Sequence, residues 1–179
     1  MKKSLLKIFG IVLILFLIKD IILISVLKFS ERKVVNAYFN NDSSFNYKSN
    51  LILRIPKINL TSIVKKSDDD FKNLDSYLVY YKHDNYKEKI IIFGHSGMGY
   101  GVHFNRLDEL LVGDIAYIYK NRFEITYEVS KKYTVLDTQV NLLNNDKRGI
   151  LLLITCEKKD KNKRLVVELT LKGSKTLTK

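Results

Sequence analysis

The sequence predicts an all-β protein with short helices, preceded by an apolar N-terminal segment. The first observation is a series of short apolar runs, ended by polar residues, which are typical of buried strands. The second is that eight such runs recur at short intervals beyond residue 50. With 179 residues, one proline and no internal repeat, the chain has room for one ordinary domain plus an appendage. Many short strands in one domain predict a β-barrel or a sandwich.

The predicted elements follow the chain in order. The strands are expected at residues 51–55, 60–64, 77–81, 90–94, 114–119, 123–136, 150–155 and 164–171. Short helices are predicted near residues 103–111 and at residues 68–75, where acidic residues favour the first turn. The domain division that follows is an N-terminal anchor (1–28), a stalk or linker (29–50), the main domain (51–173) and a polar tail (174–179).

The anchor is predicted from hydropathy. Two apolar runs, 8–18 and 21–27, are interrupted only by Lys19 and Asp20. About 20 residues are needed to cross a bilayer. A charged residue at the membrane centre makes the free energy of insertion less favourable by about 2.5 to 3.5 kcal/mol. Each Leu or Ile makes it more favourable by about 0.3 to 0.6 kcal/mol. We therefore expect one transmembrane helix.

Two further properties of this segment are whether it is cleaved and how it is oriented in the membrane. A cleaved signal peptide is the alternative, because residues 8–18 have the length of its apolar region. No small-x-small cleavage site follows within a few residues, which favours an uncleaved anchor. Basic residues flank the segment in equal number, so the positive-inside rule does not select an orientation: Lys2, Lys3 and Lys7 before it, Lys28, Arg32 and Lys33 after it.

Three side chains that can take part in catalysis lie where predicted strands meet loops. Cys156 is the only cysteine and ends an apolar run, Arg164 opens the next run, and His95 follows the run that ends at Phe93. Taken singly, a free cysteine is usually an inert buried residue, and a loop histidine or a strand-end arginine is usually solvated. Rigid elements often hold functional groups at such positions. The combination therefore predicts a cysteine acyl-transfer site.

Each of these side chains has a role in that chemistry. A thiolate is the nucleophile, and a nearby cation favours the thiolate over the thiol. The guanidinium of Arg164 can stabilise the tetrahedral oxyanion, as other oxyanion-hole donors do by about 3 kcal/mol. The imidazole of His95 can give a proton to the leaving amine and take one from the incoming amine. His83, in a polar loop, and His103, before Phe104, are the competing histidines.

The same residues carry a resemblance to the sortase family. The runs Leu-Ile-Thr-Cys, ending at Cys156, and Arg-Leu-Val-Val, starting at Arg164, resemble the sortase patterns T-L-x-T-C and R-x-V-V. Residues 93–96 and 104–114 resemble the segment around the sortase histidine, and residues 54–58 resemble the strand that opens the domain. The resemblance covers residues 51–172. It departs from the pattern at Leu152, where the family has threonine.

The resemblance implies a closed sortase-like β-barrel of about eight strands over residues 51–173. It implies a cysteine transpeptidase in which His95, Cys156 and Arg164 are catalytic and no cofactor takes part. The expected partners are sorting-signal peptides similar to Leu-Pro-x-Thr-Gly and an amine of the cell wall or of a pilin-like protein. The expected location is the cell membrane, with a single span and an extracellular catalytic domain. A class A-like or D-like sortase is favoured, and the acidic cluster that forms the calcium site of some class A sortases has no counterpart.

The same residues are consistent with two other functions. The segment Gly-His-Ser-Gly-Met, residues 94–98, approaches the G-x-S-x-G elbow of serine hydrolases with Ser96 as nucleophile, but methionine replaces the last glycine. A membrane-tethered barrel that binds a peptide without cutting it is the third possibility. The formal charge of +12 suggests an anionic membrane surface or wall polymer. No nucleic-acid-binding pattern accompanies that charge, so no nucleic acid is expected. Residues 137–148, which lead into the cysteine strand, are expected to help set specificity.

Overall fold

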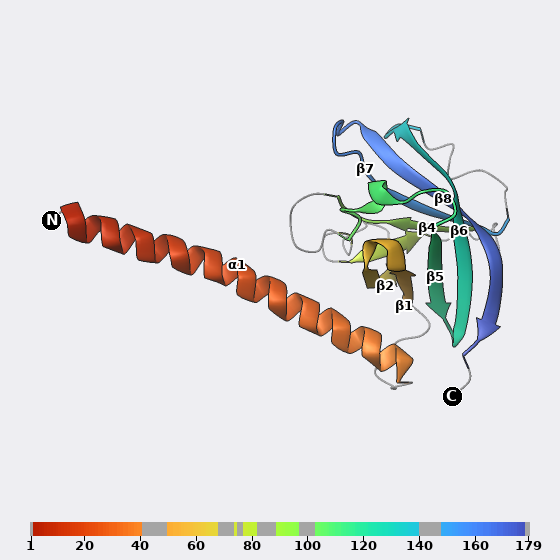
Figure 1. Cartoon of the computed structure of the whole chain (residues 1–179), viewed down its shortest axis with the longest axis horizontal. Helices are drawn as coiled ribbons and strands as arrows, with labels where there is room; N and C mark the ends of the chain where they lie inside the picture. Colours follow the sequence, from red (N-terminus) through yellow and green to blue (C-terminus); the bar gives the residue numbers. More distant parts are fainter. Residues whose placement is uncertain are drawn as a thin grey trace.

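The residues that the structure describes form one long helix and a closed β-barrel of eight strands (Figure 1). The computed structural model describes residues 2–40, 50–67, 74, 77–81, 89–96, 103–139 and 148–177. The helix, α1 (Lys2–Phe39), comes first. The strands are β1 (Asn50–Ile55), β2 (Leu60–Lys66), β3 (Leu78–Tyr81), β4 (Lys89–Phe93), β5 (Ile115–Lys120), β6 (Phe123–Leu136), β7 (Ile150–Cys156) and β8 (Lys163–Thr176). The predicted all-β barrel is confirmed.

The order of strands around the barrel is β1-β2-β3-β4-β7-β8-β6-β5, and β5 pairs with β1 to close it. Most neighbours are antiparallel, but β2 pairs with β3 and β4 pairs with β7 in parallel. Full closure removes the unpaired edges that would otherwise invite association. The parallel β4–β7 pair is important for the site, because it places the carboxyl ends of both strands at the same end of the barrel.

The barrel core follows from strand alternation. Side chains at every second position point inward, and in β7 these include Leu151 and Leu153, both fully buried in the main core. The other face of β7 is buried as well, because Leu152 and Ile154 belong to a second cluster with Ile91 of β4. Burial on both faces explains why the sequence of β7 is a continuous apolar run and does not alternate.

Two predicted elements differ from the structure. β8 continues to Thr176, five residues beyond the predicted strand, and its polar end pairs with the beginning of β6 at Phe123. The sequence does not indicate this extension, because its side chains are exposed and pairing with β6, rather than burial, holds it in the sheet. Near residues 103–111 the chain forms only turns and a 3₁₀ helix, η3 (Leu107–Glu109). The predicted helix at residues 68–75 lies outside the described residues, apart from Leu74.

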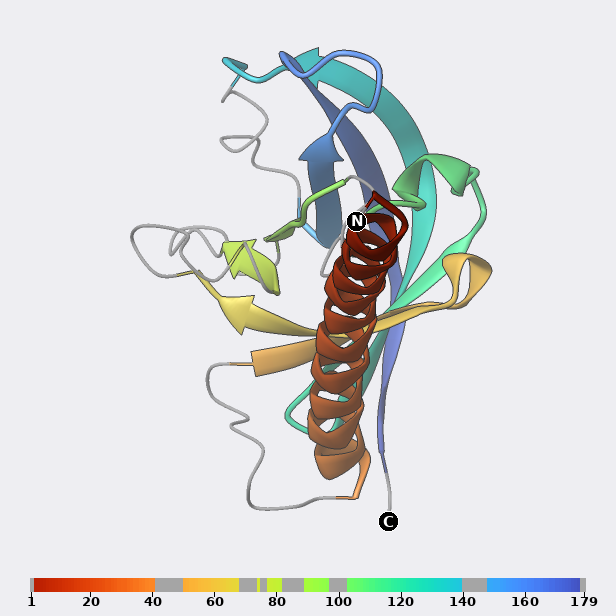
Figure 2. The same ribbon diagram turned by 90° about the vertical axis from the view of Figure 1, so that its left-hand side faces the viewer.

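The C-terminal turns of α1 pack against the outside of the barrel. Val35 and Tyr38 are buried against Ile52, Ile63 and Tyr119, and Glu31 accepts a hydrogen bond from the hydroxyl of Ser62. Figure 2 shows this end of the helix beside β1 and β2, and Figure 1 shows the rest extending away from the barrel. The predicted anchor–stalk division at residue 28 therefore falls inside one helix.

No helix among the described residues has the length and apolar character needed to cross a membrane.

Candidate active site

The topology brings His95 and Cys156 to the same end of two neighbouring strands. β4 and β7 are parallel and in register, with Phe93 opposite Ile154. His95 follows Phe93 by two residues, and Cys156 follows Ile154 by two residues. Because neighbouring strands lie about 4.8 Å apart, this register sets the imidazole-bearing and thiol-bearing residues side by side.

Arg164 comes to the same place through the antiparallel pairing of β7 and β8. Cys156 and Arg164 are direct register partners at the end of this ladder. Side chains of such a pair have Cβ atoms about 5 Å apart and lie on the same face of the sheet. The intervening turn is closed by backbone hydrogen bonds, from Glu157 N to Lys163 O at 2.9 Å and from Lys163 N to Asp160 O at 3.0 Å.

The guanidinium of Arg164 is held on two sides. Its Nη1 donates to the carbonyl oxygens of Lys161 at 2.9 Å and Lys163 at 3.1 Å. Its Nη2 lies 3.6 Å from a carboxylate oxygen of Asp137, and the two side chains are about one-third exposed. Asp137 follows the last residue of β6, and it is one of the residues expected to help set specificity. Its ion pair with Arg164 was not predicted, because it depends on the β6–β8 register that puts Val135 opposite Arg164.

The backbone at His95 is fixed by its neighbours. Gly94 N donates to Ile154 O at 3.1 Å, which continues the β4–β7 ladder, and Phe104 N donates to His95 O at 3.1 Å. Gly94 itself leaves no room for a side chain, because a Cβ there would meet the side chain of Leu78 and lie 2.8 Å from the ring of Phe104. The Gly-His pair therefore allows the chain to pass close to the core just before the histidine.

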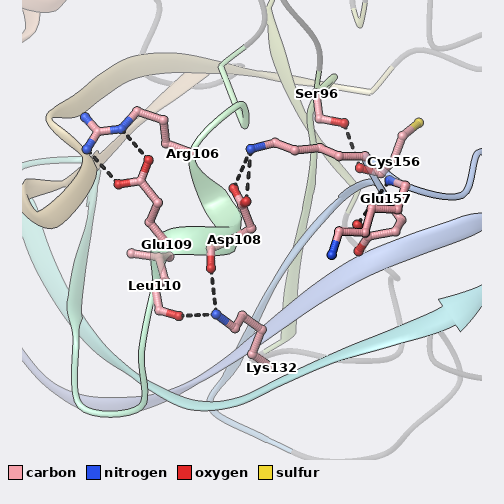
Figure 3. A network of polar contacts seen from close by, with 10 residues as sticks. Ser96, Arg106, Asp108, Glu109, Leu110, Lys132, Cys156 and Glu157 are labelled. Carbon is pink, nitrogen blue, oxygen red and sulfur yellow. Dashed lines mark hydrogen bonds and ion pairs between the residues drawn. The ribbon is translucent and has the colours of Figure 1, made fainter.

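Two polar links join the histidine segment to the cysteine loop (Figure 3). Ser96 Oγ donates to the backbone carbonyl of Cys156 at 2.6 Å. Farther along, Lys158 Nζ lies 2.8 Å from a carboxylate oxygen of Asp108, while Lys132 Nζ donates to the carbonyls of Asp108 and Leu110. Burial raises the pKa of Asp108, but the hydrogen bond and charge of Lys158, with Lys132, outweigh burial and leave that pKa below its ordinary value.

The three candidate residues line one cavity of about 310 Å³. The cavity is within the size range of ligand pockets. Asp137 and Thr155 also line it, and its apolar wall comes from four strands: Phe93 of β4, Val135 of β6, Ile154 of β7 and Val166 of β8. The arrangement combines a thiol, an imidazole and a cationic donor at the edge of an apolar cleft.

The competing residues lie elsewhere or have other partners. His103 is not among the residues that line the cavity, and His83 lies outside the described residues. The hydroxyl of Ser96 donates to the Cys156 carbonyl. The strands of the described part of the chain form a closed barrel and do not alternate with helices as in an α/β-hydrolase. Among the described residues, no group of three or more His, Cys, Asp or Glu side chains is placed to hold a metal ion.

The fold and the sequence were compared with known proteins. The family model described as "Sortase domain" matches residues 53–172. Sortase A of Listeria monocytogenes has a TM-score of 0.65 and 24% identity, covering 73% of this chain and 92% of that chain. Sortase C-3 of Streptococcus pneumoniae has a TM-score of 0.64 and 24% identity, covering 73% of this chain and 66% of that chain. A sortase D5 transpeptidase of Clostridium perfringens has a TM-score of 0.62 and 18% identity, covering 83% of this chain and 99% of that chain.

No curated protein sequence matches the chain. The family model nevertheless spans well over half of its length, and the segments that carry the predicted resemblance lie within or at the edges of the matched region. The chain therefore belongs to the sortase family. The similar structures include class A, C and D sortases, and they do not distinguish among these classes.

Proposed function

We propose that the protein is a membrane-anchored cysteine transpeptidase that cleaves a sorting signal similar to Leu-Pro-x-Thr-Gly and transfers the acyl group to an amine. The observation that carries this proposal is that His95, Cys156 and Arg164 line one cavity in a chain of the sortase family. Each of the three supplies a group that acyl transfer through a thioester requires. Cys156 supplies the nucleophile, His95 carries protons, and Arg164 donates hydrogen bonds to the oxyanion.

Acylation uses all three groups. The thiolate of Cys156 attacks the carbonyl carbon of the scissile peptide bond, forming a C–S bond and a tetrahedral oxyanion. Arg164 donates to this oxyanion, and its position is defined because two backbone carbonyls already hold its Nη1. The carbon–nitrogen bond then breaks as the imidazolium of His95 gives its proton to the leaving amine. The acyl group is left on sulfur as a thioester.

Deacylation reverses the proton transfers. An incoming amine attacks the thioester carbonyl, and the neutral imidazole of His95 takes a proton from that amine. The second oxyanion is again stabilised by Arg164. When it collapses, the C–S bond breaks, a new amide bond remains, and the thiolate and imidazolium are restored. Water in place of the amine gives hydrolysis.

The apolar wall of the cavity suits the aliphatic part of such a sorting signal. Phe93, Val135, Ile154 and Val166 present hydrocarbon beside the thiol, and burying apolar area contributes about 25 cal/mol per Å². Gln139 and Asp137, at the end of β6, add polar groups on one side of the cleft. Most of the segment expected to contribute to specificity, residues 140–147, lies outside the described residues.

We assign the acceptor to an amine of the cell wall or of a pilin-like protein, and the location to the outer face of the cell membrane. The apolar runs 8–18 and 21–27 support the anchor. The docking of Val35 and Tyr38 on the barrel supports a short, fixed connection between the anchor and the catalytic domain.

The test is acyl-enzyme formation. The full-length chain is incubated with sorting-signal peptides and amine acceptors, and intact-protein mass spectrometry reads the adduct. We expect the wild type to gain the mass of the acyl fragment and to release a transpeptidation product. Cys156→Ser, which differs by one atom, and Cys156→Ala should do neither. Turnover by Cys156→Ala would contradict the proposal and favour Ser96, and peptide binding by the wild type without any cleavage would favour a non-catalytic binding barrel.

A further inference from the structure

The hydroxyl of Ser96 donates to a carbonyl that would accept a backbone N–H in a regular parallel ladder. The last backbone bond between β4 and β7 runs from Gly94 N to Ile154 O. In a parallel pair the next bond is expected two residues on, from residue 96 to the carbonyl of Cys156. That carbonyl instead accepts the side-chain hydroxyl of Ser96, at 2.6 Å.

This bond ties the two candidate catalytic strands together beyond the point where β4 ends. β4 ends at Phe93 and β7 ends at Cys156, so the segment that carries His95 has left the sheet. Gly94 N and Ser96 Oγ bond to β7 on either side of the histidine, and Phe104 N holds the carbonyl of His95 itself. The backbone of the imidazole-bearing residue is thus fixed before, at and after its position.

We infer that Ser96 is a positioning residue, which sets the distance between His95 and Cys156 through its hydrogen bond to the Cys156 carbonyl. This inference rests on the proposed transpeptidase function and names a further residue for it. Ser96 donates to a main-chain oxygen, so it need not touch the substrate. Small displacements of reacting groups, on the order of 1 Å, can cost about 10²-fold in rate. A hydroxyl at this position therefore matters for kcat more than for KM.

The chain offers a matched control. Ser130 Oγ of β6 donates to the backbone carbonyl of Glu168 in β8 at 3.0 Å, the same kind of bond between neighbouring strands. Ser130 does not line the catalytic cavity. Ser96→Ala and Ser130→Ala each remove one hydroxyl-to-carbonyl bond, so a purely structural role predicts similar effects of the two substitutions.

The experiment measures kcat and KM for peptide cleavage by full-length Ser96→Ala, Ser96→Thr and Ser130→Ala. We expect kcat of Ser96→Ala to fall about 10-fold or more, with KM within about twofold. Threonine keeps the hydroxyl, so the kcat of Ser96→Thr should be within about threefold of the wild-type value. The kcat of Ser130→Ala should equal the wild-type value. Equal kcat values for Ser96→Ala and Ser130→Ala would overturn the inference, as would a Ser96→Thr variant as slow as Ser96→Ala.

A second measurement separates this inference from the proposed function. Cys156 is the only cysteine, so alkylation by iodoacetamide at neutral pH reports on that thiol alone. Loss of the Ser96 hydrogen bond to the Cys156 carbonyl should change the surroundings of the thiol. We therefore expect the alkylation rate of Ser96→Ala to fall severalfold while that of Ser130→Ala stays unchanged. If the wild type cleaves no peptide but these rates differ, the transpeptidase proposal fails and the positioning role stands. Equal alkylation rates would refute the positioning role whatever the peptide result.

Discussion

Cys156 and Arg164 are register partners at the end of the β7–β8 ladder, where the strand pair opens into the turn that joins them. Pairing between the two strands fixes the backbone positions of both residues. The carbonyls of Lys161 and Lys163 accept hydrogen bonds from the guanidinium and fix its position as well. The cationic group beside the thiol is thereby prepared before any substrate arrives. Such preorganisation lets a donor stabilise a developing oxyanion without rearranging.

Arg164→Lys tests this relationship. Lysine keeps the charge but loses the planar fork that bonds two carbonyls and a carboxylate at once. We expect kcat for peptide cleavage to fall by about 10² or more, with the thermal unfolding midpoint nearly unchanged, because the arginine is partly exposed. Arg122→Lys, in the β5–β6 turn, is the matched control and should remain active. Alanine variants of Lys161 and Lys163 should also remain active, since only their backbone carbonyls bind Arg164. A near-wild-type rate for Arg164→Lys would show that the residue is ordinary surface charge.

Asp137→Asn is expected to increase the rate. The carboxylate, 3.6 Å from Arg164, partly cancels the positive charge that would face the oxyanion. The two backbone carbonyls still hold Nη1 when Asp137 becomes neutral, so the guanidinium keeps its place. Exposed ion pairs contribute about 0.2 to 1 kcal/mol. We therefore expect a rise in kcat/KM of less than about fivefold, measured by steady-state cleavage, and little loss of stability. A fall of tenfold or more would instead show that the carboxylate holds Arg164 in its working position.

The Asp108–Lys158 pair gives the stability of the protein an acid-sensitive component. The pKa of Asp108 lies below its ordinary value of 3.8, because the contacts with Lys158 and Lys132 outweigh burial. A carboxylate whose pKa is lowered by folding stabilises the fold above its unfolded-state pKa, and that contribution is lost as the pH falls through the folded-state value. The unfolding temperature of the wild type should therefore exceed that of Asp108→Asn at pH 7. The two temperatures should converge as the pH falls below 3.8 and through the folded-state pKa of Asp108. A constant difference across this range would exclude the ion pair as its source. Because Asp108 is partly exposed, the expected difference is under about 1 kcal/mol.

Thr155 carries a buried hydroxyl in the residue before Cys156. Its Oγ1 has no hydrogen-bond partner among the described residues, and the residue is 3% exposed. Leaving such a group unpaired costs about 1 to 3 kcal/mol. Thr155→Val should therefore raise the free energy of unfolding by about 1 kcal/mol in denaturant titrations, whereas Thr134→Val, on an exposed position of β6, should change it by less than about 0.5 kcal/mol. A destabilised Thr155→Val variant would show that the hydroxyl does have a partner in the folded protein.

The strands were predictable because their residues are continuous apolar runs whose ends coincide with polar residues. β6 (Phe123–Leu136) has the predicted limits, and β7 (Ile150–Cys156) is longer by one residue. The exposed end of β8 was missed because pairing with β6, rather than burial, holds it in place. The docking of Tyr38 on Tyr119, with ring centroids 6.2 Å apart, was also missed, since it joins a helix to a barrel face that no local pattern indicates.

The site was predictable only in part for a related reason. Cys156, His95 and Arg164 could be selected from residue type and position at strand ends, together with the family pattern, and the structure places all three around one cavity. Asp137 and Ser96 are common polar residues in loops, and their partners are set by register between strands that are distant in sequence. Register follows from closure of the whole barrel, so a single sequence segment does not reveal it.

The final prediction concerns topology: residues 1–7 are cytoplasmic, the apolar runs within 8–27 span the membrane without being cleaved, and the barrel is outside. Protease added to protoplasts should degrade the barrel and leave a short membrane-bound fragment that retains the N-terminus. Protection of the barrel until the membrane is broken would show the opposite orientation, and a mature protein that begins after residue 20 would identify a signal peptide.

Deleting residues 1–28 should release a soluble, active domain, because Glu31, Val35 and Tyr38 remain to cover the barrel face. Extending the deletion to residue 39 removes that cover and exposes Ile52, Ile63 and Tyr119. The longer deletion should therefore have a lower unfolding temperature than the shorter one, although His95, Cys156 and Arg164 are untouched by both.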